Sequence, residues 1–125
     1  MRKRKRRRGK KCRHPCECGW RVNWTKAFRV RAQEMGLWNN IRGELKDLEK
    51  RLRDINTRSK ALLFLESQPV VAYYPFQGKR YLIRRIYFGR QTARAGFIIR
   101  RDICRVWFVA LVPRSDSTYR RRRWS

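Results

Sequence analysis

Apolar and polar positions follow two different periods along the first third of the chain. Trp20, Val22 and Trp24 alternate with polar neighbours, and a period of two is typical of a half-buried strand. The next apolar positions recur at helical spacing, up to a glycine that is expected to end a short helix. These positions are Phe28, Ala32, Met35 and Gly36.

A longer amphipathic helix is predicted over residues 41–55. Its apolar positions step by four, three, four and three, which places all of them on one helix face. They are Ile41, Leu45, Leu48, Leu52 and Ile55. Asn56 and Thr57 indicate a break, after which Thr57 or Ser59 is expected to cap a further helical segment that ends at Pro69.

The C-terminal third predicts three strands in residues 79–112, joined by tight turns at Gly89-Arg90 and Arg101-Asp102. Residues 103–112 are nearly all apolar, so this segment is expected to be a central strand covered on both faces. Residues 70–79 are expected to form a loop. The order of helices before strands predicts an α+β fold, in which a small antiparallel sheet packs against two or three N-terminal helices. The N-terminal strand and a C-terminal three-stranded meander would make that sheet.

The charge of the chain indicates a polyanionic partner. Lys and Arg number 35 against 9 acidic residues among 125, a net charge of +26, and such a surface attracts phosphate-rich molecules. Residues 1–19 are predicted to be a flexible basic tail, residues 20–119 one α+β domain, and residues 120–125 an arginine-rich tail. No apolar run is long enough to span a membrane, and the basic N-terminus lacks the apolar stretch of a secretory signal. A cytoplasmic protein with no membrane partner is therefore expected.

A cluster of soft ligands lies within the basic N-terminal region. Cys12, His14, Cys16 and Cys18 supply the four ligands that structural zinc takes, although they are unusually close in sequence. A zinc site and a set of redox-sensitive thiols both stay open as interpretations. The fourth cysteine, Cys104, is expected in an apolar strand, which makes a poor disulfide framework and favours a reducing compartment.

The helical region and the strands together resemble the RelE/ParE toxin superfamily over residues 20–119. The resemblance rests on the run Glu44-Leu-Lys-Asp-Leu-Glu-Lys50, on Glu66-Ser-Gln-Pro69 and on the arginine-bearing strands that follow. It implies a small sheet flanked by N-terminal helices that cleaves messenger RNA on the ribosome, or that poisons gyrase as in ParE-type members. It also implies an acidic antitoxin as protein partner. The cysteine cluster and the high charge depart from the family pattern.

The resemblance assigns roles to three residues. Arg94 lies where the ribonuclease members carry an arginine, Arg114 matches a second basic residue, and Tyr119 matches a tyrosine a few residues further on. Arg94 and Arg114 would clamp the scissile phosphate without a metal ion, since guanidinium suits bidentate phosphate contacts. Positive charge near Tyr119 favours its ionised form, so this residue would act as a base or stack on a nucleobase.

Further basic residues are predicted to contact nucleic acid without catalysis. They are Lys46, Lys50 and Arg53 on the long helix, Arg84 and Arg85 in the first strand of the meander, and Arg120, Arg121, Arg122, Arg123 and Trp124 at the C-terminus. Two alternatives stay open beside the ribonuclease toxin. One is a non-catalytic protein that binds nucleic acid or the ribosome through both tails, and the other is a ParE-like topoisomerase poison.

Overall fold

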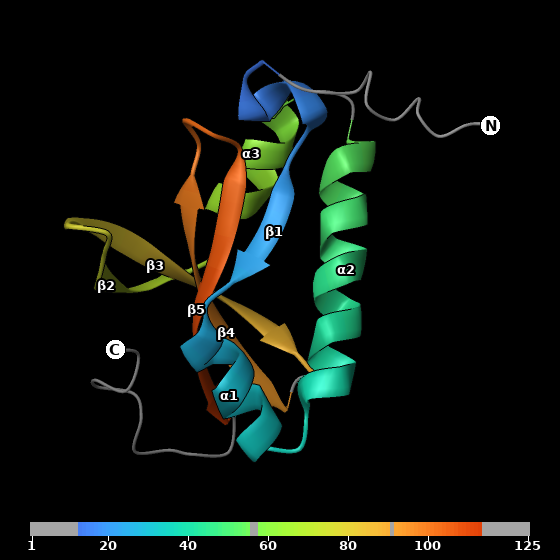
Figure 1. Cartoon of the computed structure of the whole chain (residues 1–125), viewed down its shortest axis with the longest axis vertical. Coiled ribbons are helices and arrows are strands. Elements are labelled where there is room, and N and C mark those ends of the chain that lie inside the picture. The colour runs from blue at the N-terminus through green and yellow to red at the C-terminus, as the bar shows by residue number, and fades with distance from the viewer. Residues whose placement is uncertain (1–12, 56–57, 91, 114–125) are drawn as a thin grey trace.

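The computed structural model describes residues 13–55, 58–90 and 92–113, and it confirms the predicted α+β class (Figure 1). A 3₁₀ turn at Pro15–Cys18 precedes the first strand. The elements then follow as β1 (Arg21–Trp24), α1 (Lys26–Glu34), α2 (Trp38–Asp54), α3 (Arg58–Glu66), β2 (Val70–Phe76), β3 (Lys79–Phe88), β4 (Ala93–Arg100) and β5 (Arg105–Pro113). Among the described helices, none has the length and apolar character needed to span a membrane.

The helices begin and end largely where the sequence predicts. The Thr25 hydroxyl accepts a hydrogen bond from the backbone N–H of Phe28 at 3.2 Å and so caps α1. Gly36, with a φ of +72°, terminates the turn after α1. The predicted apolar face of α2 is confirmed, since Ile41, Leu45, Leu48 and Leu52 are all buried. Thr57 lies outside the described residues, and Ser59 lies inside α3 rather than before it.

The described strands form one sheet in the order β1-β5-β4-β3-β2. Strands β2 to β5 pair antiparallel, but β1 pairs with β5 in parallel, where an antiparallel sheet was expected. The prediction of a loop over residues 70–79 was wrong, because Val70–Phe76 form β2 and make a hairpin with β3 through Gln77 and Gly78. The sequence did not predict this strand because Pro75 argues against a strand interior. This proline is tolerated because β2 lies at the edge of the sheet.

The sheet buries apolar residues on both faces, and the three helices lie against one of them. The larger cluster includes Phe28, Leu45 and Phe108 and contains all the buried helical residues. A smaller cluster lies on the opposite face, with Ile83 and Ile98 fully buried and aromatic residues of the β2–β3 hairpin around them. We call this the helix-free face, since no described helix packs on it. Strand β5 is buried on both faces, as predicted.

Two carboxylates of α2 fasten the helix to the sheet. Glu49 Oε2 accepts a hydrogen bond from the backbone N–H of Val22 at 2.9 Å, on the side of β1 that has no neighbouring strand. Glu44 Oε2 accepts one from Gly89, in the turn between β3 and β4, at 2.6 Å. The exposed edge of β1 is thereby capped, and α2 lies along this side of the sheet, away from the β2–β3 hairpin (Figure 1).

A disulfide joins Cys16 to Cys104 across 88 residues of sequence. The prediction that the cysteines make a poor disulfide framework was therefore wrong. Cys104 is buried in the turn before β5 rather than within a strand, and its φ of +53° places it in the left-handed region. Cys18 is disulfide-bonded as well. The bond to Cys104 ties Cys16, which was assigned to the predicted tail, to the β4–β5 turn of the sheet.

We expect the Cys16–Cys104 bond to stabilise the fold by restricting the unfolded chain. For a closed loop of this length the entropic effect is up to about 4 kcal/mol. The variant Cys16→Ala/Cys104→Ala should therefore lose free energy of unfolding in urea titrations, up to this limit. Reductant should lower the stability of the wild type by at least as much, while the same reductant on the variant isolates the contribution of the bond at Cys18. Equal stabilities of wild type and variant without reductant would contradict the prediction.

We also expect Glu49→Ala to destabilise the protein by about 1–2 kcal/mol, because the backbone N–H of Val22 at the edge of β1 loses its charged hydrogen-bond acceptor. Glu34→Ala is the matched control. Glu34 forms an exposed ion pair with Arg31 at 3.8 Å, and such pairs contribute little. Urea unfolding of both variants tests this. Similar losses for the two would show that Glu49 does not hold the strand edge.

Candidate nucleic-acid interface

A tyrosine between two arginines lies on the helix-free face at one end of the β3–β4 pair. The guanidinium carbon of Arg85 is 5.5 Å from the centroid of the Tyr87 ring, and that of Arg94 is 5.6 Å away. Tyr87 and Arg94 are direct cross-strand partners. Both distances fall within the range of cation–π contacts. We call Arg85, Tyr87 and Arg94 the Tyr87 cluster.

Strand alternation explains why these three side chains share a face. Phe88 and Ala93, their neighbours in β3 and β4, belong to the core under the helices. Successive side chains of a strand point to opposite faces, so Tyr87 and Arg94 point away from that core. All three residues of the Tyr87 cluster are half-buried. The cluster can present guanidinium groups to a phosphate and an aromatic ring to a nucleobase.

A second group of aromatic and basic side chains lies further along the same face. Phe76 contacts both Tyr81 and Trp107, with ring centroids 6.3 Å and 5.5 Å away. The guanidinium of Arg100 lies 5.9 Å from the Tyr81 ring and forms an ion pair with Asp102 at 3.3 Å. A hydrogen bond from Arg100 lowers the pKa of Asp102 below its usual value. Arg100 is therefore already engaged within the protein.

Arg84 has a structural contact that the sequence did not suggest. Its Nη1 donates hydrogen bonds to the backbone carbonyls of Glu66 at 2.6 Å and Gln68 at 2.7 Å. These carbonyls lie at and just after the end of α3, where backbone acceptors have no helical partner. Arg84 was predicted to contact nucleic acid, but its guanidinium instead closes α3 against β3.

The three basic residues predicted on α2 lie in a different layer from Arg94. Lys46, Lys50 and Arg53 are exposed and line a depression of about 500 Å³ together with Glu49 and Asp54. Helix α2 packs on one sheet face and Arg94 points from the other. The structure therefore does not bring these residues together with the Tyr87 cluster.

The remaining site predictions fall outside the described residues. Arg114 and Tyr119, assigned to catalysis by the resemblance, are among them, as are Arg120, Arg121, Arg122, Arg123 and Trp124. Arg94 is thus the member of the predicted catalytic set whose position is described. Sequence reasoning missed Tyr87, although the alternation of Ile86 and Phe88 with Arg85 and Tyr87 signals a polar, aromatic strand face.

The predicted zinc ligands do not assemble into a metal site among the described residues. His14 Nδ1 accepts a hydrogen bond from the backbone N–H of Cys16 at 3.1 Å and so caps the 3₁₀ turn. The sulfurs of Cys16 and Cys18 are both in disulfides, whereas zinc needs thiolates. Cys12 lies outside the described residues.

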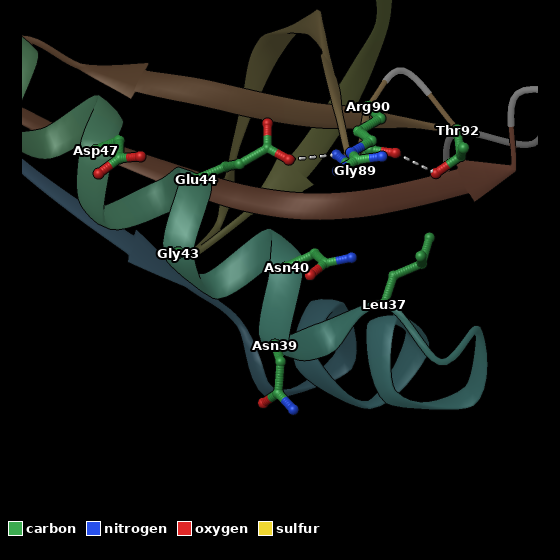
Figure 2. A pocket seen from close by; sticks show the side chains of 9 residues that line it. All are labelled: Leu37, Asn39, Asn40, Gly43, Glu44, Asp47, Gly89, Arg90 and Thr92. Carbon is green, nitrogen blue, oxygen red and sulfur yellow. Dashed lines mark hydrogen bonds between the residues drawn. The ribbon is translucent and has the colours of Figure 1, made fainter.

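A cavity of about 580 Å³ lies between α2 and the β3–β4 turn. Figure 2 shows Glu44 reaching across it to Gly89, with Leu37 and Asn40 directed toward the same turn. The left-handed φ of Gly89 (+62°) and the 2.9 Å approach of Thr92 Oγ1 to a Cβ built there leave no room for a side chain. Two carboxylates, Glu44 and Asp47, line the cavity, so it disfavours phosphate, and the Tyr87 cluster is the better anion site.

A comparison with protein-family models, curated proteins and solved structures finds no match for this chain.

Neighbouring arginines of β3 should respond differently to truncation. Arg84→Ala should lower the free energy of unfolding by about 1–3 kcal/mol, because two carbonyls at the end of α3 lose a charged donor. Arg85→Ala should change it by less than about 0.5 kcal/mol, as expected for a side chain outside the core. Urea unfolding of the two variants tests this contrast. Equal effects would contradict the opposite orientation of the two side chains.

Proposed function

We propose that this protein binds single-stranded RNA through its helix-free face and acts as a RelE-like toxin on messenger RNA. The observation that carries the proposal is the Tyr87 cluster, in which two guanidinium groups flank one aromatic ring on a strongly basic protein. Arginine beside an aromatic ring is the combination that grips a phosphate and stacks a base at once. An unpaired strand offers both groups, whereas a duplex hides its base faces.

RNA cleavage is the more specific part of the proposal. It rests on the resemblance to the RelE/ParE superfamily together with the position of Arg94. RNA cleavage without a metal ion needs the 2′-hydroxyl deprotonated and the charge on the pentacovalent phosphate neutralised. Arg85 and Arg94 would supply the second requirement. The proposed base is a tyrosine phenolate, either Tyr119 from the resemblance or Tyr87, whose ring lies beside both arginines. It takes the proton of the 2′-hydroxyl, and the phenol so formed donates a proton to the leaving 5′-oxygen. No cofactor is part of this chemistry, and the zinc alternative would require Cys16 and Cys18 to be reduced.

The proposal includes a cytoplasmic setting and two partners, the ribosome and an acidic antitoxin. The cytoplasmic setting is proposed because messenger RNA is the target. The cysteines do not support it, since disulfides are rare in cytosolic proteins outside hyperthermophiles. A partner of negative charge suits a surface of +26, because complementary charge accelerates association. The main alternative is a non-catalytic protein that binds RNA through the same face but has no catalytic base.

The experiment combines RNA binding with mapping of transcript ends. Arg85→Ala/Arg94→Ala should weaken the affinity for a fluorescent oligouridylate by about tenfold or more, since each guanidinium loses a charge-assisted contact. Arg42→Ala/Lys46→Ala removes two exposed charges from α2 and is the matched control. Anisotropy titrations at fixed salt compare the two. Equal affinities of the two double variants would contradict binding at the helix-free face.

Primer extension on transcripts after brief induction then separates cleavage from binding alone. New 5′ ends that appear with the wild type and vanish with Arg94→Ala support the toxin. Tyr87→Phe and Tyr119→Phe identify which phenol is required. Binding that depends on Arg85 and Arg94, without any new transcript ends, would favour the non-catalytic alternative.

A further inference from the structure

Three arginines lie side by side across the other end of the helix-free face. Arg21 of β1 pairs in register with Arg105 of β5, and Arg105 pairs with Arg100 of β4. Their neighbours Val22 and Val106 are buried under the helices, so the arginines point to the opposite face. We call Arg21, Arg105 and Arg100 the arginine row.

Within the arginine row, the pairing of Arg21 with Arg105 is electrostatically unfavourable, whereas Arg100 has an ion pair with Asp102. Like charges directly opposite each other on a sheet destabilise it, and Arg21 has no ion pair within the described residues. Burial lowers the pKa of Arg105, and the charge of Arg21 lowers it further, while Glu49 acts weakly in the opposite sense. Glu49 is itself bound to the backbone of β1. An anion between Arg21 and Arg105 would relieve the repulsion.

The geometry of Arg105 favours a fixed anion site. Its Nη1 donates hydrogen bonds to the backbone carbonyls of Ile103 at 3.0 Å and Cys104 at 3.3 Å. One side of the guanidinium is thereby anchored to the β4–β5 turn, which reduces the entropy lost when the group binds a phosphate. Arg21 is exposed beside it. Trp107, two residues further along β5, is half-buried on the same face and contacts Phe76.

The arginine row and the Tyr87 cluster lie at opposite ends of one strand. Arg100 lies six positions after Arg94 in β4, which corresponds to about 20 Å at the rise of a strand. The aromatic side chain of Trp107, a cross-strand partner of Ile98, lies between the two ends, and the ring of Tyr81 lies beside Arg100. Small β-folds that bind single strands have footprints that begin at about four nucleotides, and the length of this face is of that order.

We propose that Arg21 and Arg105 form a second phosphate-binding site, so that the helix-free face holds one RNA strand at both ends over roughly four nucleotides. The inference rests on the proposed RNA binding and adds the site, its ligand chemistry and the length of RNA that it requires. The Tyr87 cluster holds one phosphate, and the Arg21–Arg105 pair holds another, about 20 Å away along β4. A strand too short to reach both ends uses one of them.

The test is the dependence of affinity on RNA length. Fluorescent oligouridylates of 2, 4, 6 and 8 nucleotides are titrated with the full chain, with Arg21→Ala and with Arg42→Ala. Arg42 is an exposed arginine of α2, so this control removes the same charge from the helical side. Arg21→Ala should weaken binding of the 6- and 8-nucleotide strands by about tenfold, the effect of one charge-assisted contact, and that of the 2-nucleotide strand by less than about twofold.

The salt dependence gives a second readout on the same proteins. For the 8-nucleotide strand, Arg21→Ala should reduce the slope of log affinity against log salt by about 0.7, the value for one lost phosphate contact on a single strand. Arg42→Ala should leave this slope unchanged. Equal affinities and slopes for Arg21→Ala and Arg42→Ala at every length would overturn the second site.

The variant Arg85→Ala/Arg94→Ala separates failure of this inference from failure of the proposed function. If it weakens binding at all lengths while Arg21→Ala behaves as the control, the RNA interface stands and the second phosphate site is wrong. If neither variant differs from its α2 control, the face does not bind RNA and both proposals fail. Arg105 is left intact throughout, because its hydrogen bonds hold the β4–β5 turn.

Discussion

The ring of Phe108 holds the two layers of this protein together. It lies fully buried in β5, with ring centroids 5.6 Å from Phe28 of α1, 5.4 Å from Phe88 of β3 and 5.3 Å from Phe97 of β4. Tilted aromatic contacts of this kind add to the free energy of apolar burial. Because the helices gather on the Phe108 side of the sheet, the opposite face of β3, β4 and β5 packs only against the β2–β3 hairpin among the described elements and carries its arginines at the two ends of the small apolar cluster.

The scarce acidic residues explain why the protein carries a large excess of positive charge. Glu44 and Glu49 accept hydrogen bonds from backbone N–H groups at the sheet edge and at the β3–β4 turn. Asp102 and Glu66 pair with Arg100 and Arg101 at the β4–β5 turn. With 9 acidic residues for 35 basic ones, the fold uses these four carboxylates to fix its elements, and the basic residues far outnumber the carboxylates that could pair with them.

The sequence predicted the elements with strong periodicity and missed those that depend on tertiary context. The apolar stripe of α2 and the doubly buried β5 follow from local spacing and are confirmed. The strand β2 was missed because its Pro75 argues against a strand unless the segment is known to be at an edge. The disulfide was missed because Cys16 and Cys104 are far apart in sequence and meet through the packing of the 3₁₀ turn on the sheet.

The candidate site depends on which face of the sheet each side chain occupies, and the sequence analysis did not assign those faces. Arg94 was identified, but in a chain with this many arginines its residue type says little, and its significance comes from the contact with Tyr87. Arg84 and Arg85 are equivalent in sequence and differ because Arg84 meets the end of α3. Self-repulsion at +26 disfavours the compact state, while the disulfide and a bound polyanion both oppose unfolding. The proposed RNA binding would therefore stabilise the fold, and it would do so most for a protein whose disulfides are reduced.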